Sequence, residues 1–238
     1  MPTTCFTPIL GKRLRATVLG AGGSLPAAAA EDSMAVTDGF MSVTLSSEAA
    51  DGTEIITKKA DGSLCVNEQG DSSFKRFTLA MEFCGVDPGL LSVVTNAEIY
   101  ENYEAIASGI VVPEGVLNKR FALELWTGLS GGAPGAEGEE ASGYLLLPFV
   151  ASGMLGDISI DGENAVTFSL TSSFTKGGNQ WGRGPYNVMT DPEGGGAGIA
   201  GPGLLPTALD PLDHLLLVET GIAPPASVCG LQAMPPLA

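Results

Sequence analysis

The sequence has 238 residues, enough for one large domain or two smaller ones. Asp and Glu outnumber Lys and Arg by 27 to 11, so the formal net charge is −16, while 44% of the residues are hydrophobic. This balance excludes nucleic-acid binding through a basic patch and attraction to an anionic membrane surface, and it leaves enough apolar side chains for a core. No apolar run approaches the roughly 18 residues of a membrane-spanning helix.

The cysteines and the single histidine do not follow a metal-binding pattern. Cys5, Cys65, Cys84 and Cys229 are scattered, and His214 is the only histidine. A tetrahedral zinc site would need four ligands from distant parts of the chain. We therefore expect buried free thiols and no cofactor.

The first half of the chain predicts strands and one helix. Short apolar stretches at residues 13–19, 40–46 and 53–59 favour strands, and residues 77–83 alternate apolar and polar side chains. Asp87 is a suitable N-cap and Pro88 suits the first helical position, so we predict a short helix over residues 88–95. Asp-Gly pairs favour tight hairpin turns and occur at Asp38-Gly39, Asp51-Gly52, Asp61-Gly62 and Asp161-Gly162.

The second half continues the strand pattern. Weaker strands are predicted at residues 106–112, 144–150 and 158–160, and residues 120–125 and 166–171 alternate apolar and polar positions. A period of two indicates one buried face and one polar face. The predicted fold class is therefore mainly β, an antiparallel β-sandwich or partial barrel with one short flanking helix.

Three segments fall outside this regular pattern. Residues 46–74 are too long for a simple hairpin loop and are expected to project from a domain formed by residues 1–190. Residues 128–143 form a Gly- and Glu-rich loop. Residues 191–238 are rich in Gly and Pro, and we expect an extended C-terminal arm.

Two motifs suggest enzymes, but their surroundings argue against catalysis. Residues 18–23 resemble a dinucleotide-binding turn, yet the third glycine position is Leu25 and hairpins replace the alternating strands and helices that such a site needs. Residues 128–132 match G-x-S-x-G, but the Gly-Pro-Gly-rich sequence that follows is unsuited to the required helix. We predict a protein that is not an enzyme.

Several stretches together resemble the major tail tube proteins of long-tailed bacteriophages that infect actinobacteria. The resemblance covers roughly residues 36–190 and is carried by residues 38–45, 51–59, 62–67, 75–88, 164–170 and 181–186. The resemblance implies a β-sandwich, six copies of which close into a ring through a shared inner β-barrel.

The resemblance also implies a place and partners. The protein would assemble in the host cytoplasm, form stacked rings in the virion tail, and contact the tail terminator, tape measure and distal tail proteins, while DNA passes through the lumen without specific binding. The alternatives are a capsid decoration or head–tail joining protein, or a carbohydrate-binding or hydrolytic β-sandwich.

Candidate functional residues follow from this interpretation. A channel that conducts DNA should present acidic or neutral side chains, because each contact between a phosphate and Lys or Arg adds affinity. Glu82, Glu124 and Asp157 lie on or beside alternating strands and are our candidates for the lumen. The inter-subunit candidates are Lys58, Lys59, Leu215 and Leu217. The lysines lie in the projecting segment, which is expected to pack on a neighbouring subunit, and an apolar strand at residues 215–218 could pair with a neighbour's sheet edge.

Overall fold

The computed structural model describes residues 7–27, 30–85, 87–130, 141–160, 166–196 and 199–235. These residues contain 16 strands and one helix, and every strand pair is antiparallel. The predicted mainly antiparallel β class with one short helix is therefore confirmed. Within the described residues the sheet does not close into a barrel. No helix in this part of the chain is both long and apolar enough to cross a bilayer.

The elements follow one another in the chain with these bounds: β1 (Pro8–Val18), β2 (Met34–Thr37), β3 (Phe40–Ala50), β4 (Glu54–Lys58), β5 (Leu64–Gln69), β6 (Ser73–Cys84), α1 (Pro88–Val94), β7 (Glu98–Glu101), β8 (Ala107–Val111), β9 (Arg120–Leu129), β10 (Ser142–Ala151), β11 (Met154–Ser159), β12 (Thr167–Thr175), β13 (Met189–Asp191), β14 (Gly201–Gly203), β15 (Leu216–Thr220) and β16 (Val228–Gln232).

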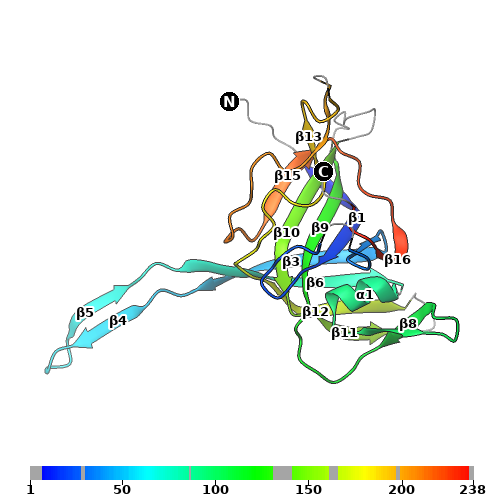
Figure 1. Ribbon diagram of the computed structural model, residues 1–238. Coiled ribbons are helices and arrows are strands. Elements are labelled where there is room, and N and C mark those ends of the chain that lie inside the picture. Colours follow the sequence, from blue (N-terminus) through cyan, green and yellow to red (C-terminus); the bar gives the residue numbers. More distant parts are fainter. Residues whose placement is uncertain are drawn as a thin grey trace.

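One sharply bent sheet forms both layers of the body (Figure 1). Its first part has the order β16-β2-β1-β9-β10, with β15 paired to the first half of β10. Its second part has the order β12-β6-β3, with β11 on the other side of β12. Among the described strands, the two parts are hydrogen-bonded to each other where Val150 and Ala151 of β10 pair with Thr175 and Phe174 of β12. The arrangement is consistent with a β-sandwich folded from one continuous sheet.

The main core lies between the two parts of the sheet and under α1. Leu79 and Leu123 are buried, as their alternating strands predict, and Phe168 is also buried. The helix closes one end of this core with Leu90, Val93 and Val94. Asp87 caps it as predicted, because its side chain accepts hydrogen bonds from the backbone N–H groups of Gly89 and Leu90.

A second apolar cluster covers the opposite face of the first part of the sheet. Trp126 and Tyr144 project from β9 and β10 into it, and Trp181, Leu205 and Met234 close over them from the last third of the chain. Strands β9 and β10 are consequently buried on both faces. The prediction of a solvent-exposed polar face on residues 120–125 is therefore wrong, because side chains from the last third of the chain cover that face.

The described residues of the C-terminal segment, which the sequence predicts as an extended arm that could pair with a neighbour, pack on their own subunit. Strand β15 pairs with β10 and β16 pairs with β2 of the same subunit. The hydroxyl of Thr220 donates to the carbonyl of Val188, and the buried Met234 belongs to the second apolar cluster. Residues beyond 191 therefore complete the fold of their own subunit, because their apolar side chains find a sheet face there.

The Asp-Gly pairs serve three different purposes. Asp61-Gly62 closes the β4–β5 hairpin as predicted, with Gly62 at a φ of 84°. Asp38-Gly39 instead lies where the chain passes from β2 in one part of the sheet to β3 in the other. Gly52 allows a close crossing, since a Cβ there would lie 1.9 Å from the carbonyl oxygen of Gly70. Asp161-Gly162 lies outside the described residues.

Candidate assembly interface

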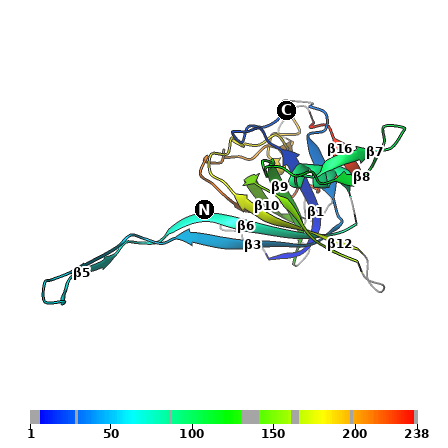
Figure 2. The same ribbon diagram turned by 90° about the horizontal axis from the view of Figure 1, so that it is seen from below.

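A two-stranded arm extends the sheet away from the body. Strands β3 and β6 run out of the sandwich and continue as β4 and β5 in one long ribbon (Figure 1 and Figure 2). Every residue of β4 and β5 is exposed. The arm comprises residues 51–72 and lies within residues 46–74, the segment that the sequence predicts to project.

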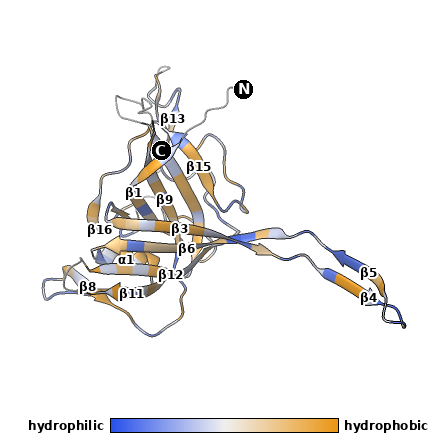
Figure 3. Ribbon diagram, turned by 180° about the vertical axis from the view of Figure 1, so that it is seen from behind, coloured by the Kyte–Doolittle hydropathy of each residue, from blue (hydrophilic) through white to orange (hydrophobic). Residues whose placement is uncertain are grey.

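Both faces of the arm carry exposed apolar side chains. The register places Ile55 and Val66 on one face and Ile56 and Leu64 on the other. Figure 3 shows hydrophobic stretches in the arm well away from the body. An isolated two-stranded hairpin is marginal in water, and it becomes stable when a third strand or another surface covers an apolar face. The arm therefore has the composition of a segment that packs against a partner.

Charged side chains are concentrated where the arm leaves the body. The carboxylate of Glu48 accepts hydrogen bonds from Lys75 Nζ at 2.8 Å and Arg76 Nε at 2.5 Å. Arg76 and then Lys75 lower the pKa of Glu48 to about 2. The guanidinium of Arg76 also lies over the ring of Phe174, 4.4 Å from its centroid. Two cations thus share one carboxylate at this position.

An aromatic hollow of about 500 Å³ opens beside these charges, and we call it the arm-base hollow. Phe74 is half exposed and packs edge-on against His214, with ring centroids 5.2 Å apart. His214 Nδ1 lies 2.7 Å from the hydroxyl of Thr175, and burial lowers the pKa of this histidine. The hollow is lined by Phe74, Lys75, Arg76, Phe174, Thr175, Lys176, Gly177, Leu212 and His214.

The outer face of the second part of the sheet is polar and mostly uncharged. Small and hydroxyl side chains cover its strands, namely Ser42, Thr44, Ser46, Thr78, Ala80, Ser169 and Thr171. Two of the predicted lumen residues lie on or beside this face. Glu82 is exposed and accepts a hydrogen bond from Ser42, and Asp157 is exposed on β11. These strands therefore present hydroxyl groups and carboxylates to solvent.

The third predicted lumen residue, Glu124, lies inside the subunit with 0% of its surface exposed. Its carboxylate forms two hydrogen bonds with Arg15, from Nε and Nη2, each 2.6 Å long. Tyr144 donates a third bond to the same carboxylate at 2.6 Å. Glu124 therefore cannot line a channel, and the sequence reasoning failed because it assigned every polar position of β9 to solvent.

Aromatic rings enclose this ion pair. The Arg15 guanidinium lies 3.3 Å from the ring centroid of Tyr186 and 5.0 Å from that of Trp126. Burial, followed by the charge of Glu124, raises the pKa of Tyr144 well above its usual value, and burial raises the pKa of Tyr186 to about 12. Both phenols stay protonated and serve as donors, so the cluster fixes the covering layer to the sheet.

The four predicted inter-subunit residues occupy two different environments. Lys58 and Lys59 are exposed near the tip of the arm. Leu215 is half-buried against the main core, and Leu217 pairs with Leu145 in the same subunit while remaining 48% exposed. The lysines are thus open to solvent at the arm tip, whereas the leucines contact other residues of their own chain.

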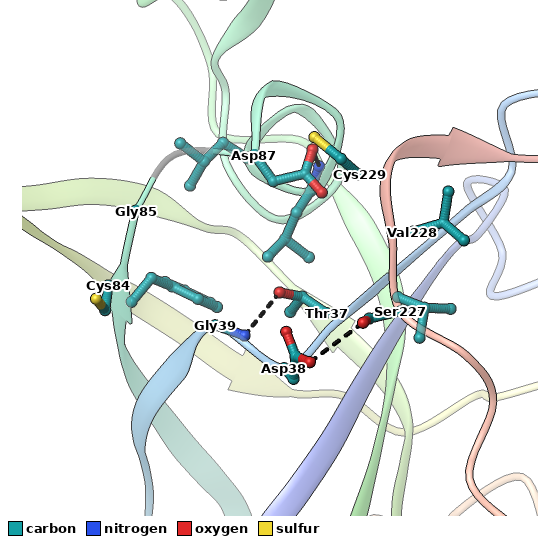
Figure 4. A pocket seen from close by; sticks show the side chains of 13 residues that line it. Thr37, Asp38, Gly39, Cys84, Gly85, Asp87, Ser227, Val228 and Cys229 are labelled. Carbon is teal, nitrogen blue, oxygen red and sulfur yellow. Dashed lines mark hydrogen bonds between the residues drawn. The ribbon is translucent and has the colours of Figure 1, made fainter.

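A further pocket of about 240 Å³ lies between β2, the end of β6, α1 and β16 (Figure 4). Asp38 is bonded to Arg13 and Ser227, and Asp87 caps the helix and accepts from the N–H of Gly230. These carboxylates fasten the C-terminal strand to the body. No group of three or more His, Cys, Asp or Glu side chains in the described residues is arranged to hold a metal ion.

The described cysteines are exposed, contrary to the buried thiols that the sequence suggested. Cys84 and Cys229 lie on different walls of this pocket, and Cys65 is on the arm. Cys5 lies outside the described residues. At the two enzyme-like motifs, the residues after β1 turn without entering a helix, and Leu129 ends strand β9, while residues 131 and 132 lie outside the described residues.

Sequence reasoning did not identify the arm-base hollow, because its members come from three distant segments whose meeting depends on the β6–β12 pairing. No family model matches the chain, and no curated protein matches its sequence.

Proposed function

We propose that this protein is a structural subunit that polymerises through its projecting arm, as the major tail tube subunit of a long-tailed bacteriophage. The observation that carries the proposal is the arm itself, a ribbon with exposed apolar side chains on both faces. Apolar side chains so displayed are stabilised when another surface covers them.

The most economical partner is another copy of the same chain. Strand β3 is an open edge of the sheet. A strand from a second copy could pair with this edge and continue the sheet across the interface. An edge strand and an arm at one side of each subunit favour contacts that repeat from copy to copy, forming rings and then stacked rings. In the family that the sequence resembles, such rings have six members and form the tail tube.

The polar face of the second part of the sheet supports a channel for DNA. Its hydroxyl groups, together with Glu82 and Asp157, would form a hydrated channel wall. The middle of these strands carries no Lys or Arg that could bind a phosphate. Cations along such a wall would bind DNA and slow its passage. The charge of −16 per subunit acts in the same direction.

Electron microscopy of the purified chain tests the proposal. In the informative variant, residues 51–72 are replaced by Asn-Gly, which joins the paired residues Ala50 and Ser73 through a two-residue hairpin turn. We expect tubes or rings from the natural chain, and a folded but unassembled body from the variant.

A milder variant separates the arm's surface from its length. Ile55→Ser combined with Leu64→Ser keeps the ribbon but removes one apolar side chain from each face, and Thr57→Ser serves as the control. Assembly should fail in the double variant and persist in the control. Monomers or trimers from the natural chain would contradict a tube and favour a decoration or head–tail joining role.

A further inference from the structure

We propose that the β7–β8 hairpin of one copy docks into the arm-base hollow of the next, so that subunits join head to tail. This contact rests on the proposed function, because it names the surfaces through which copies would meet. The two surfaces lie on opposite sides of one subunit (Figure 1 and Figure 2).

The tip of the β7–β8 hairpin is acidic and apolar at once. Glu101 and Glu104 are exposed there and form no ion pair with a cation of the described residues. Tyr103 is wholly exposed and Ile106 is more than half exposed. An exposed aromatic side chain is of the kind enriched at the centre of protein interfaces, and the carboxylates around it would form the polar rim.

The tip is also held in one shape before any contact. The side chain of Asn102 accepts hydrogen bonds from the backbone N–H groups of Glu104 and Ile106, at 2.9 and 3.0 Å. Its own N–H bonds to the carbonyl of Ile106, and Ala105 adopts a φ of 57°. A loop that is already ordered loses little conformational entropy on binding, so a small surface can suffice.

The arm-base hollow has the opposite charge and a matching apolar floor. It brings together Lys75, Arg76 and Lys176, against the carboxylates of Glu48 and Asp213, on a chain whose net charge is strongly negative. Half-exposed Phe74 and well-exposed Leu212 provide the apolar surface. Opposite charges across an interface select the partner and its orientation more than they add affinity.

The direction of the strands places these surfaces at the two ends of the sheet. Strand β6 begins at the hollow with Ser73 and ends at Cys84, after which α1 leads directly into β7. A contact between different patches of identical molecules is heterologous, so each docking leaves a free hairpin and a free hollow for further copies. Such contacts generate a closed ring or an open filament.

Charge reversal tests the contact by mixing two variants. The hairpin variant carries Glu101→Lys and Glu104→Lys, and the hollow variant carries Lys75→Glu and Lys176→Glu. The hairpin variant has a positive hairpin and a positive hollow, and the hollow variant has a negative hairpin and a negative hollow, so neither can bind itself. In a mixture, each hairpin meets a hollow of opposite charge on the other variant. Glu31→Lys with Glu193→Lys makes the same charge change as the hairpin variant at exposed sites elsewhere and is the control.

Sedimentation velocity and electron microscopy provide the readout, with circular dichroism to show that each variant is folded. We expect each variant alone to need a roughly tenfold higher concentration to associate, and the equimolar mixture and the control to behave as the natural chain does. The reversal Lys58→Glu with Lys59→Glu, added to the chain that already carries the hairpin changes, should not restore association, because it leaves the arm-base hollow positively charged.

The outcomes separate this contact from the tube. Tubes that form equally well from the hairpin variant, or rescue when the arm-tip reversal is added to the hairpin variant in the same chain, would overturn the contact and leave the tube proposal standing. Small oligomers that the single variants abolish and the mixture restores would support the contact while contradicting the tube. A natural chain that stays monomeric at all concentrations refutes both.

Discussion

Removing one partner of the buried Arg15–Glu124 pair should destabilise the protein far more than removing both. In Arg15→Met the Glu124 carboxylate keeps only the hydroxyl of Tyr144 as a donor and remains out of contact with water. An uncompensated buried charge of this kind costs about 3–5 kcal/mol. For a chain of this length, that corresponds to a fall in the melting temperature of roughly 6–20 °C.

The double variant Arg15→Met, Glu124→Leu should recover most of that loss. Its apolar side chains fill the space without burying a charge, and the remaining penalty is the unsatisfied hydroxyl of Tyr144, worth about 1–3 kcal/mol. Adding Tyr144→Phe should bring stability close to that of the natural chain.

Urea unfolding followed by circular dichroism, with calorimetry for the melting temperature, measures the complete cycle. The argument requires strong coupling, so the double variant must be more stable than either single variant. Additive losses, or single losses below about 1 kcal/mol, would show that the pair is screened by water and would refute the reasoning.

Three other outcomes follow from contacts of the C-terminal segment. Gly89→Ala should lower the midpoint of denaturant unfolding, because the added Cβ would lie within 3.0 Å of the β16 backbone. This clash must outweigh the helix propensity of alanine, which favours the variant by about 1 kcal/mol. An unchanged or higher midpoint would contradict the prediction. Hydrogen bonds from Arg13 and then Ser227 lower the pKa of Asp38, so its stabilising contribution is present above the ordinary value of 3.8 and is lost as the pH falls through the lower folded value. Acid-active protease should therefore cut the C-terminal segment faster at low pH, with Asp38→Asn cut faster even at neutral pH, and equal rates would count against the fastening role. Deletion of residues 191–238 should give aggregated or unfolded protein, since it uncovers the second apolar cluster, and a monomeric deletion with native circular dichroism would be inconsistent with that cluster's role.

Local signals in the sequence were sufficient for individual elements. The helix was predictable because Asp87 and Pro88 mark its start and an apolar stripe follows, all within one short segment. Leu79 was assigned to the core because β6 has one face toward the core and one toward solvent, which preserves the period of two. The hairpin at Asp61-Gly62 depends only on the residues of the turn itself.

The failures share a non-local cause. Glu124 was assigned to the solvent face because the layer that buries it comes from residues more than 50 positions later. Strand β15 was assigned to a neighbour's sheet edge because the free edge of its own β10 becomes visible only when the pairing order of the sheet is known. The arm-base hollow could not be predicted for the same reason, because it forms only where β6 and β12 pair.

The pairing of β16 with β2 has a consequence for biosynthesis. Strand β2 leaves the ribosome early, whereas its partner and the buried Met234 are made nearly two hundred residues later. Until that late stretch emerges, a nascent chain keeps one sheet edge unpaired and one apolar face open, so the body cannot become native during translation. Long-range pairing of this type also folds slowly. Nascent chains on the same messenger RNA therefore cannot associate through native surfaces. Ordered association begins after the C-terminal segment has been synthesised.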